Sequence, residues 1–296
     1  MWKGIDVSDN QGRVDWAKAG AGGVSFAILR STRRLGQEDG QFAANLAGCR
    51  AQNIPVAVYK YTYAVTPEEA RREALGVVAL LGRHRMKDTM VWWDVEDRER
   101  LKPLGSVKLT ACIREARQVI EAAGYRFGLY VGLYVLQEEW FYLDSFAAVQ
   151  LWVARYYQGG KEMSFGEEPD LSRRPQVGKP LWGWQYTASG RVPGIAGKVD
   201  LNVCWQDPAD WSRPDSDGAI WCVSIADVWS HAIAKSAAAA HPGCRVHRAV
   251  VLDAGNIEIW VASLADVWTQ AQAQTALRQL QAAGITGVVH RIRVLE

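Results

Sequence analysis

Two carboxylic acids follow a short apolar run in the segment from Val91 to Asp97. Side chains alternate between the two faces of a strand, so Trp92, Asp94 and Glu96 share one face. Alternate residues lie about 7 Å apart along the backbone, so the two carboxyl groups can approach and raise each other's pKa. One acid then stays protonated near neutral pH and can donate a proton. Two interpretations are open: an acid–base site, or the solvated end of a strand.

Further acidic and aromatic residues occupy the ends of other expected strands. Carboxylates supply acid–base chemistry and aromatic rings stack on sugar faces, so their convergence on one rim predicts a carbohydrate cleft. Ordinary core packing is the other interpretation of the rings. The residues are Asp6, Tyr59, Tyr61, Tyr130, Trp184, Tyr186 and Asp200.

The elements that position these residues are short apolar strands separated, in the first half of the chain, by helices. Strands are expected over 2–8, 24–29, 55–63, 90–95, 126–131, 151–154, 181–186 and 198–202, and the clearest helices over 42–52, 67–81 and 106–123. Alternating strands and helices predict a parallel α/β architecture. Up to eight strands in about 205 residues fit an irregular TIM-like β/α barrel with missing helices, whose strand ends form the active site.

Composition excludes several classes of function. The 296 residues carry 34 basic and 32 acidic side chains without a Lys/Arg run, so nucleic-acid binding is not expected. No segment has the roughly 18 consecutive apolar residues of a membrane span. The five cysteines and five histidines lack the spacing of metal ligands, so neither metal nor cofactor is expected. Met1 leads directly into a strand-like segment without a signal peptide, which predicts synthesis in the cytoplasm.

Several segments together are similar to one enzyme family. Residues 1 to about 206 resemble family 25 of the glycoside hydrolases, the lysozymes or N-acetylmuramidases of phage endolysins and bacterial autolysins. The resemblance rests on the order and spacing of Gly4-Ile5-Asp6-Val7-Ser8, Tyr59, Asp94-Val95-Glu96, Leu151-Trp152-Val153-Ala154-Arg155-Tyr156, Trp184-Gln185-Tyr186 and Val199-Asp200-Leu201-Asn202.

The resemblance implies cleavage of the β-1,4 bond between N-acetylmuramic acid and N-acetylglucosamine in peptidoglycan. Glu96 matches the family's general acid, and Asp94 its partner, which either orients the substrate's acetamido group for internal attack or stabilises charge directly. Asp6 and Asp200 match flanking acids of the cleft.

Two positions depart from the family pattern. Relatives often have a Lys-Ala-Thr-Glu-Gly-like run after the second strand, whereas this chain has Arg30-Ser31-Thr32-Arg33-Arg34, with arginine where an acid is common. Lys60 replaces a frequent histidine between the aromatic residues of the third strand. These changes concern substrate contacts rather than the catalytic pair.

The sequence of the C-terminal third predicts a separate domain. A Pro/Asp/Ser-rich linker over 208–218 separates the catalytic barrel, 1–207, from an internal repeat over 219–296. Ile220–Ser230 matches Ile259–Thr269, and each copy reads strand, helix, strand. Two copies predict a small ferredoxin-like α+β domain of βαββαβ order. The module resembles SPOR-type domains, which are associated with peptidoglycan glycan strands.

The repeat also duplicates two tryptophans. Trp221 corresponds to Trp260, and Trp229 to Trp268; they are either equivalent core residues or an exposed pair that binds glycan or a second subunit. A homodimer through a free sheet edge is a further expectation.

The sequence thus predicts a phage-type endolysin, made in the host cytoplasm, that reaches the cell wall after holin-type release and binds peptidoglycan glycan strands. The alternatives are a non-catalytic glycan-binding protein on a hydrolase barrel, and a bacterial autolysin or toxin-like effector with the same chemistry.

Overall fold

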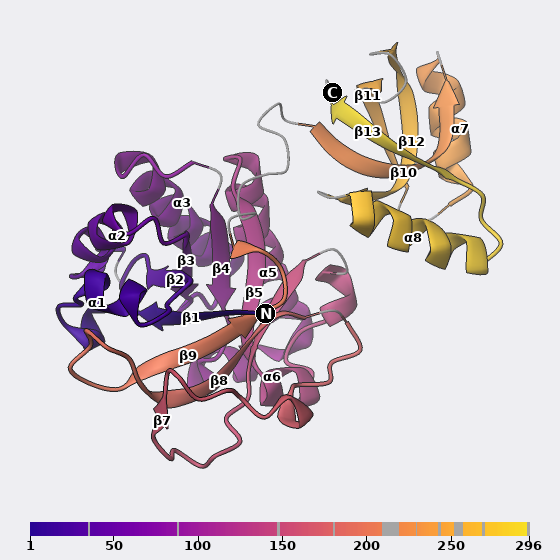
Figure 1. Cartoon of the computed structure of the whole chain (residues 1–296). Helices are drawn as coiled ribbons and strands as arrows, with labels where there is room; N and C mark the ends of the chain where they lie inside the picture. The colour runs from indigo at the N-terminus through magenta and orange to yellow at the C-terminus, as the bar shows by residue number, and fades with distance from the viewer. Residues whose placement is uncertain are drawn as a thin grey trace. The chain divides into compact units, whose positions relative to one another are not determined.

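The computed structural model describes residues 1–34, 36–87, 89–146, 149–179, 181–208, 219–228, 230–241, 244–251, 257–267 and 270–294. The chain divides into two compact units, Met1–Ser212 and Arg213–Glu296 (Figure 1). Each unit has its own hydrophobic clusters.

Eight strands of the first unit close into a barrel. Strands β1 to β6 are parallel and adjacent in chain order, β8 pairs in parallel with β6, and β9 runs antiparallel between β8 and β1. The strands are β1 (Trp2–Val7), β2 (Phe26–Arg30), β3 (Val56–Tyr61), β4 (Met90–Asp94), β5 (Arg126–Gly132), β6 (Gln150–Ala154), β8 (Leu181–Arg191) and β9 (Val199–Cys204). The short β7 (Met163–Ser164) pairs with β8. The prediction of an irregular TIM-like barrel is confirmed.

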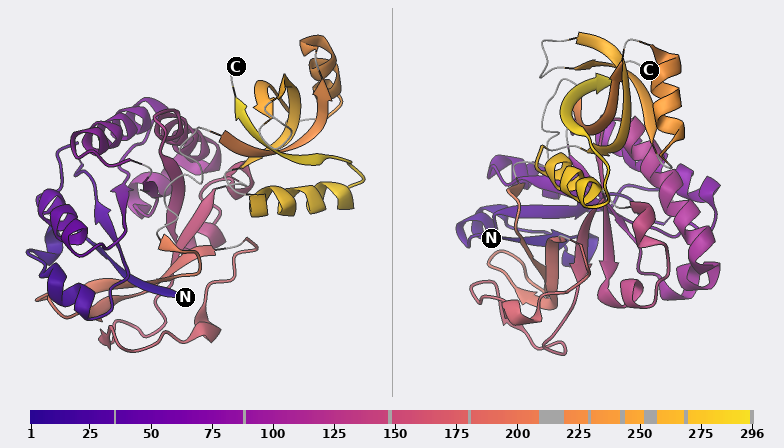
Figure 2. Two further views of the ribbon diagram at one scale, coloured as in Figure 1. Left: turned by 45° about the horizontal axis from the view of Figure 1, so that its top comes forward. Right: turned by 90° about the vertical axis from the view of Figure 1, so that its right-hand side faces the viewer.

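Helices cover the barrel unevenly, as expected. The longer helices lie outside the strands in each view of Figures 1 and 2. Within the described part of the first unit, α-helices occur only in the connections up to β6. They are α1 (Trp16–Ala21), α2 (Phe42–Ala51), α3 (Pro67–Arg83), α4 (Arg98–Leu101), α5 (Gly105–Ala122) and α6 (Leu133–Gln137). None of the described helices is both long and apolar enough to cross a membrane.

The barrel has an inner and an outer core because its strands are buried on both faces. The outer cluster lies between strands and helices and includes Val58, Val91 and Trp93. The inner cluster fills the barrel with aromatic rings, among them Trp92. This ring lies across Gly128 of β5, where an added Cβ would come within 2.4 Å of the indole.

A β-bulge in β8 changes which of its side chains face the barrel interior. Leu181 pairs with Leu151, but Gly183 pairs with Trp152, so Trp182 is an extra residue. Trp182 therefore joins the inner cluster, while Trp184 joins the outer one. Strict alternation of faces fails at this point.

The second unit has the predicted βαββαβ order. Its elements are β10 (Ala219–Val228), α7 (His231–Ala239), β11 (Arg245–Val251), β12 (Ile257–Val267), α8 (Gln270–Ala282) and β13 (Val288–Val294). The repeat is visible in the structure, because β10 and β12 carry its first segment and pair with each other antiparallel. The predicted ferredoxin-like α+β fold is confirmed, with both helices outside the strands (Figure 2).

One feature of this unit differs from an open ferredoxin-like sheet. The outer strands β11 and β13 also pair, from Ala249 with Val294 to Val251 with Ile292, and close the four strands into a small barrel. This pairing occupies the edge of β11 at Ala249–Val251 and that of β13 at Ile292–Val294, and the described strands give no support for the dimer expected from the repeat.

The repeated tryptophans are only partly described. Trp260 on β12 stacks on His231 at the start of α7, with ring centroids 3.9 Å apart. Trp229 and Trp268 lie outside the described residues, as does the side chain of Trp221.

Candidate active site

Four acids meet at one rim of the first barrel, where β1 and β4 end and β9 begins. Asp6 lies on β1 directly opposite Asp200 on the antiparallel β9. Asp94 is the last residue of β4, and Glu96 follows it by two residues. The charges of these side chains act on one another, which places them in a common site.

Asp6 and Asp200 form a pair with unequal hydrogen bonding. The Oδ2 atom of Asp6 accepts hydrogen bonds from Gln185 Nε2 at 2.8 Å and from Asn202 Nδ2 at 2.7 Å. Burial raises the pKa of Asp6, and these bonds oppose that effect. Burial and the Asp6 charge raise the pKa of Asp200 well above its usual range. The donors therefore favour Asp6 as the ionised member and Asp200 as the member that holds a proton.

Asp94 is a buried acid with a free acceptor. Its side chain is 3% exposed, and its Oδ1 atom has no hydrogen-bond partner in the described part of the chain. Burial, followed by the charges of Glu96 and Asp6, raises the pKa of Asp94 well above its usual range. An acceptor without a donor in such a place is available to a substrate N–H or O–H group.

Glu96 has the protonation behaviour of a general acid. Burial and the charge of Asp6 raise its pKa to about 7, while a hydrogen bond with Tyr130 opposes the shift. Near neutral pH, a substantial fraction of Glu96 is therefore protonated and can donate a proton.

A hydrogen-bond network fixes the base of the site. Gln185 Oε1 accepts from the hydroxyl groups of Tyr130 at 2.8 Å and Tyr156 at 2.6 Å, which orients the Gln185 amide so that its NH₂ group reaches Asp6. On the other side, Trp152 Nε1 donates to Asn202 Oδ1 at 2.8 Å. Each amide thus has one defined orientation, and both orientations present a donor to the same carboxylate oxygen.

The predicted aromatic residues separate into two groups. Strand register places Tyr61, Asp94 and Tyr130 side by side on β3, β4 and β5. Tyr59 packs against the inner cluster, and the Asp6 charge adds to burial in raising its pKa. These three tyrosines belong to the rim or the barrel interior.

Trp184 and Tyr186 belong to the other group, which lies away from the acids. Both are fully buried in the outer cluster, and Trp184 Nε1 donates to the Arg155 carbonyl oxygen. The charges that act on Tyr186 come from Glu168 and Glu167, not from the rim acids. The bulge at Trp182 is the reason: it turns these two side chains outward, so the prediction that they line the cleft is wrong.

Sequence reasoning missed several residues of the site. Asn202 shares a strand face with Asp200, so periodicity could have found it. Gln185 could not be found this way, because the bulge changes its face. Tyr134 on α6 is 36% exposed and donates from its hydroxyl to the Glu96 carbonyl oxygen at 3.1 Å, a contact between α6 and the segment that follows β4.

Comparison with known proteins decides the family. The profile described as Glycosyl hydrolases family 25 matches residues 5–195. The chain belongs to this family. Within the described residues, the family 25 barrel contains no group of three or more His, Cys, Asp and Glu side chains that could hold a metal ion.

Individual relatives are similar over the same part of the chain. Lysozyme M1 of Streptomyces globisporus is 27% identical over 210 residues, which cover 68% of this chain and 66% of the relative. The autolytic lysozyme of Clostridium acetobutylicum is 25% identical, over 68% of this chain and 55% of that protein. The structure of the modular autolysin LytC of Streptococcus pneumoniae, in complex with a synthetic peptidoglycan ligand, matches with 27% identity and a TM-score of 0.57. That match covers 69% of this chain and 46% of LytC.

Proposed function

We propose that the first unit is an N-acetylmuramidase, which hydrolyses the β-1,4 bond between N-acetylmuramic acid and N-acetylglucosamine in peptidoglycan. The observation that carries the proposal is the pair of Glu96, with a pKa raised to about 7, and Asp94, with a buried unpartnered oxygen. A lysozyme-like family and the relatives named above support the substrate class.

In this proposal, Glu96 donates its proton to the glycosidic oxygen as the bond to the sugar anomeric carbon breaks. Asp94 has one of two roles, which differ in the group that stabilises the positive charge on the anomeric carbon: the substrate's own acetamido oxygen or the Asp94 carboxylate. Its free Oδ1 atom either accepts the substrate's acetamido N–H, so that the acetamido oxygen attacks the anomeric carbon, or it faces that carbon directly. Water then adds to the anomeric carbon and returns a proton to Glu96 in either scheme.

The test is mass spectrometry of fragments released from purified peptidoglycan and reduced with borohydride. Wild type is expected to produce new reduced muramic acid ends, and Glu96→Gln none. Reduced glucosamine ends would show that a different bond is cut. Equal wall lysis by Glu96→Gln and wild type would refute the role of Glu96. If wild type binds wall but releases nothing, the alternative of a non-catalytic glycan-binding protein replaces the proposal.

For the biological role, we propose an endolysin that is made in the host cytoplasm and released to the wall by a holin. The bacterial autolysin is a second candidate, favoured by the similarity to the autolytic lysozyme and to LytC. Expression in a host cytoplasm, with and without a holin, distinguishes the endolysin role from the autolysin role. Lysis that requires co-expression of a holin supports the endolysin role, whereas lysis in the absence of any holin contradicts it.

For residues 219–296, we propose a SPOR-like wall-binding domain joined to the barrel, 1–207, by the linker 208–218. Its support is the repeat and the βαββαβ order. The full chain is then expected to lyse target walls faster than residues 1–207, because one unit holds the wall while the other cuts. Equal rates across salt concentrations and host strains would contradict a wall-binding role.

A further inference from the structure

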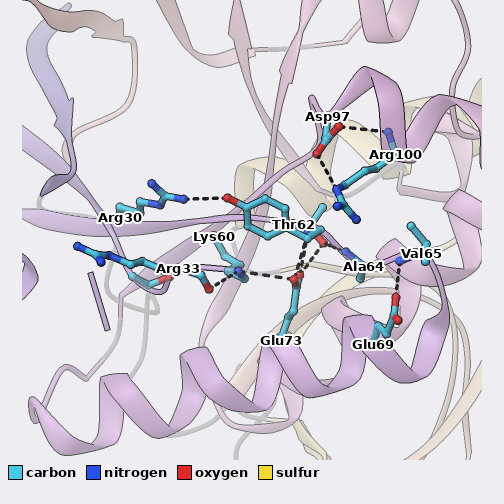
Figure 3. Close-up of polar contacts among 12 residues, drawn as sticks. Arg30, Arg33, Lys60, Thr62, Ala64, Val65, Glu69, Glu73, Asp97 and Arg100 are labelled. Carbon is cyan, nitrogen blue, oxygen red and sulfur yellow. Dashed lines mark hydrogen bonds and ion pairs between the residues drawn. The ribbon is translucent and has the colours of Figure 1, made fainter. Parts of the chain in front are cut away.

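Four cations lie near the acids, on β2, on the segment that follows it and on β3. Arg30 ends β2 and is aligned with Tyr59 of β3, which contacts the inner cluster. The charge of Arg30 acts on Asp94, so its guanidinium lies near the catalytic pair. Arg33 and Arg34 follow in the next turn. Lys60 lies on the face of β3 opposite to that of Tyr59, toward α3 (Figure 3).

Two of these four cations have anionic partners that fix them. Lys60 is fully buried and its Nζ lies 3.6 Å from Glu73 Oε1 on α3, and it also donates to the Arg33 carbonyl oxygen (Figure 3). Arg33 pairs with Asp9 through its Nη2 atom. These pairs attach the arginine segment to α3 and to the turn after β1. They hold the segment in place and leave no net charge of their own.

The other two, Arg30 and Arg34, form no ion pair in the described ranges, and both face Tyr63. Arg30 Nη2 donates to the Tyr63 hydroxyl at 3.0 Å, and Arg30 Nε is buried without an acceptor. The Arg34 guanidinium lies 5.8 Å from the centre of the Tyr63 ring. The Tyr63 backbone N–H is in turn held by Glu73 Oε1 at 3.1 Å. Tyr63, held at its backbone, thus contacts two guanidinium groups that have no carboxylate partner in the described ranges.

The two acids that act on Arg30 from the neighbouring turns are bound to other groups. Asp39 and Asp9 act on Arg30 electrostatically, but neither forms an ion pair with it. The two oxygens of Asp39 accept backbone N–H groups of Gln41 and Asp9, at 3.0 and 3.2 Å. Asp9 is already paired with Arg33. The buried N–H of Arg30 therefore still needs an acceptor, and a guanidinium fits a carboxylate better than any other biological acceptor except phosphate.

We propose that Arg30, Arg34 and Tyr63 form a subsite that binds a carboxylate of the substrate. This inference rests on the proposed function, because peptidoglycan supplies carboxylates in two places. The lactyl ether of N-acetylmuramic acid has a free carboxyl group in peptide-free glycan, and the stem peptide has its own carboxyl groups in intact wall. The replacement of the common acid by Arg33, which removes a negative charge from this rim, suits such a ligand.

The experiment measures binding and hydrolysis separately. Full-length Glu96→Gln is titrated with peptide-free glycan fragments, and with the same fragments after carbodiimide coupling of the lactyl carboxyl to methylamine. The carboxylate form is expected to bind about tenfold tighter, as a charge-assisted hydrogen bond implies. Adding Arg30→Gln should reduce the ratio of the two affinities, carboxylate form over amidated form, toward one. Arg34→Gln, which replaces an exposed side chain and is less of a risk to folding, should do the same when it is added separately. Adding Arg71→Gln, which removes a remote exposed cation on α3, should leave the ratio unchanged.

A second arm distinguishes the two sources of carboxylate. Disaccharide-peptide fragments are compared before and after amidation of their peptide carboxyl groups. A preference confined to these fragments assigns the subsite to the stem peptide, and one confined to peptide-free glycan assigns it to the lactyl group.

Equal binding of charged and amidated forms in both arms overturns the subsite, even if wild type cleaves the wall. A loss of kcat in Arg30→Gln without any change in the binding ratio also overturns it, since Arg30 then acts only on Asp94. If charged fragments bind more tightly than amidated ones but wild type releases no fragments from the wall, the carboxylate subsite is supported and the muramidase proposal is refuted.

Discussion

Replacement of Glu96 by glutamine tests the central acid through stability as well as activity. Glutamine keeps the size and hydrogen-bonding ability of the side chain but cannot ionise. Burial and the charge of Asp6 raise the pKa of Glu96 from 4.5 to about 7 in the folded protein. Folding therefore favours the protonated form, and the stability that this form contributes is lost as pH rises through about 7.

The size of this loss of stability follows from the raised pKa of Glu96. A change of about 2.5 pKa units corresponds to about 3 kcal/mol, since each unit is worth about 1.4 kcal/mol. The free energy of unfolding of Glu96→Gln, relative to wild type, should increase by about this amount between the usual glutamate pKa and about pH 8. Below the usual pKa, the difference should be constant.

The measurement is denaturant unfolding of both proteins, with the barrel transition followed at a series of pH values from about 4 to 9. Glu99→Gln is the matched control, because Glu99 is exposed on α4, three residues away. Its unfolding free energy should stay within about 0.5 kcal/mol of wild type at every pH. A difference for Glu96→Gln that does not vary with pH would refute the raised pKa.

The same variant has an expected effect on catalysis. Loss of the general acid should lower kcat by a factor on the order of 10² to 10⁴. Wild-type kcat/KM should fall as pH rises through about 7, because the acid loses its proton. A wild-type rate that keeps rising well above that pH would contradict Glu96 as the proton donor even if the stability result agrees.

Five further substitutions test the surroundings of the site or serve as controls. Gly128→Ala should lower the free energy of unfolding by about 1–3 kcal/mol, because its Cβ meets the indole ring that lies across it, whereas Gly76→Ala, in open space on α3, should raise it by about 0.5–1 kcal/mol. Asn202→Ala should cost about 1.5–3 kcal/mol in a denaturant titration, since a buried carboxylate loses a donor; a neutral result would contradict the network. Lys60→Met should cost about 3–5 kcal/mol, and adding Glu73→Gln, which removes the charge but keeps an acceptor for the Tyr63 N–H, should recover part of that loss in a double-mutant cycle; no recovery would show that the buried pair is not coupled.

Local patterns in the sequence were sufficient for the elements and for the acids. Short apolar strands alternate with helices, and the helix that begins at Pro67 has its Thr66 cap as expected, with the Thr66 hydroxyl accepting from the Glu69 N–H. Asp94 and Glu96 could be found because period two, continued from β4 into the next two residues, predicts one face for both. The duplicated segment in the C-terminal third predicted its fold for the same reason: repetition is a property of the chain itself.

Pairing between distant segments decided the rest. The bulge at Trp182 arises where β8 meets β6, about thirty residues earlier in the chain, and it moves Gln185 inward and Trp184 outward. The closure of the C-terminal strands by β11 and β13 likewise depends on a contact that no local pattern records.

The sequence alone identified the run from Arg30 to Arg34 and Lys60 as departures from the family pattern, because residue types can be compared without a fold. Only the tertiary structure gave them different surroundings. Lys60 faces a helix, where Glu73 neutralises it, whereas Arg30 faces the rim with a buried N–H that lacks an acceptor. The physical reason is that a residue's type determines its charge and donors, while long-range register determines which face it occupies and which groups are close enough to pair with it.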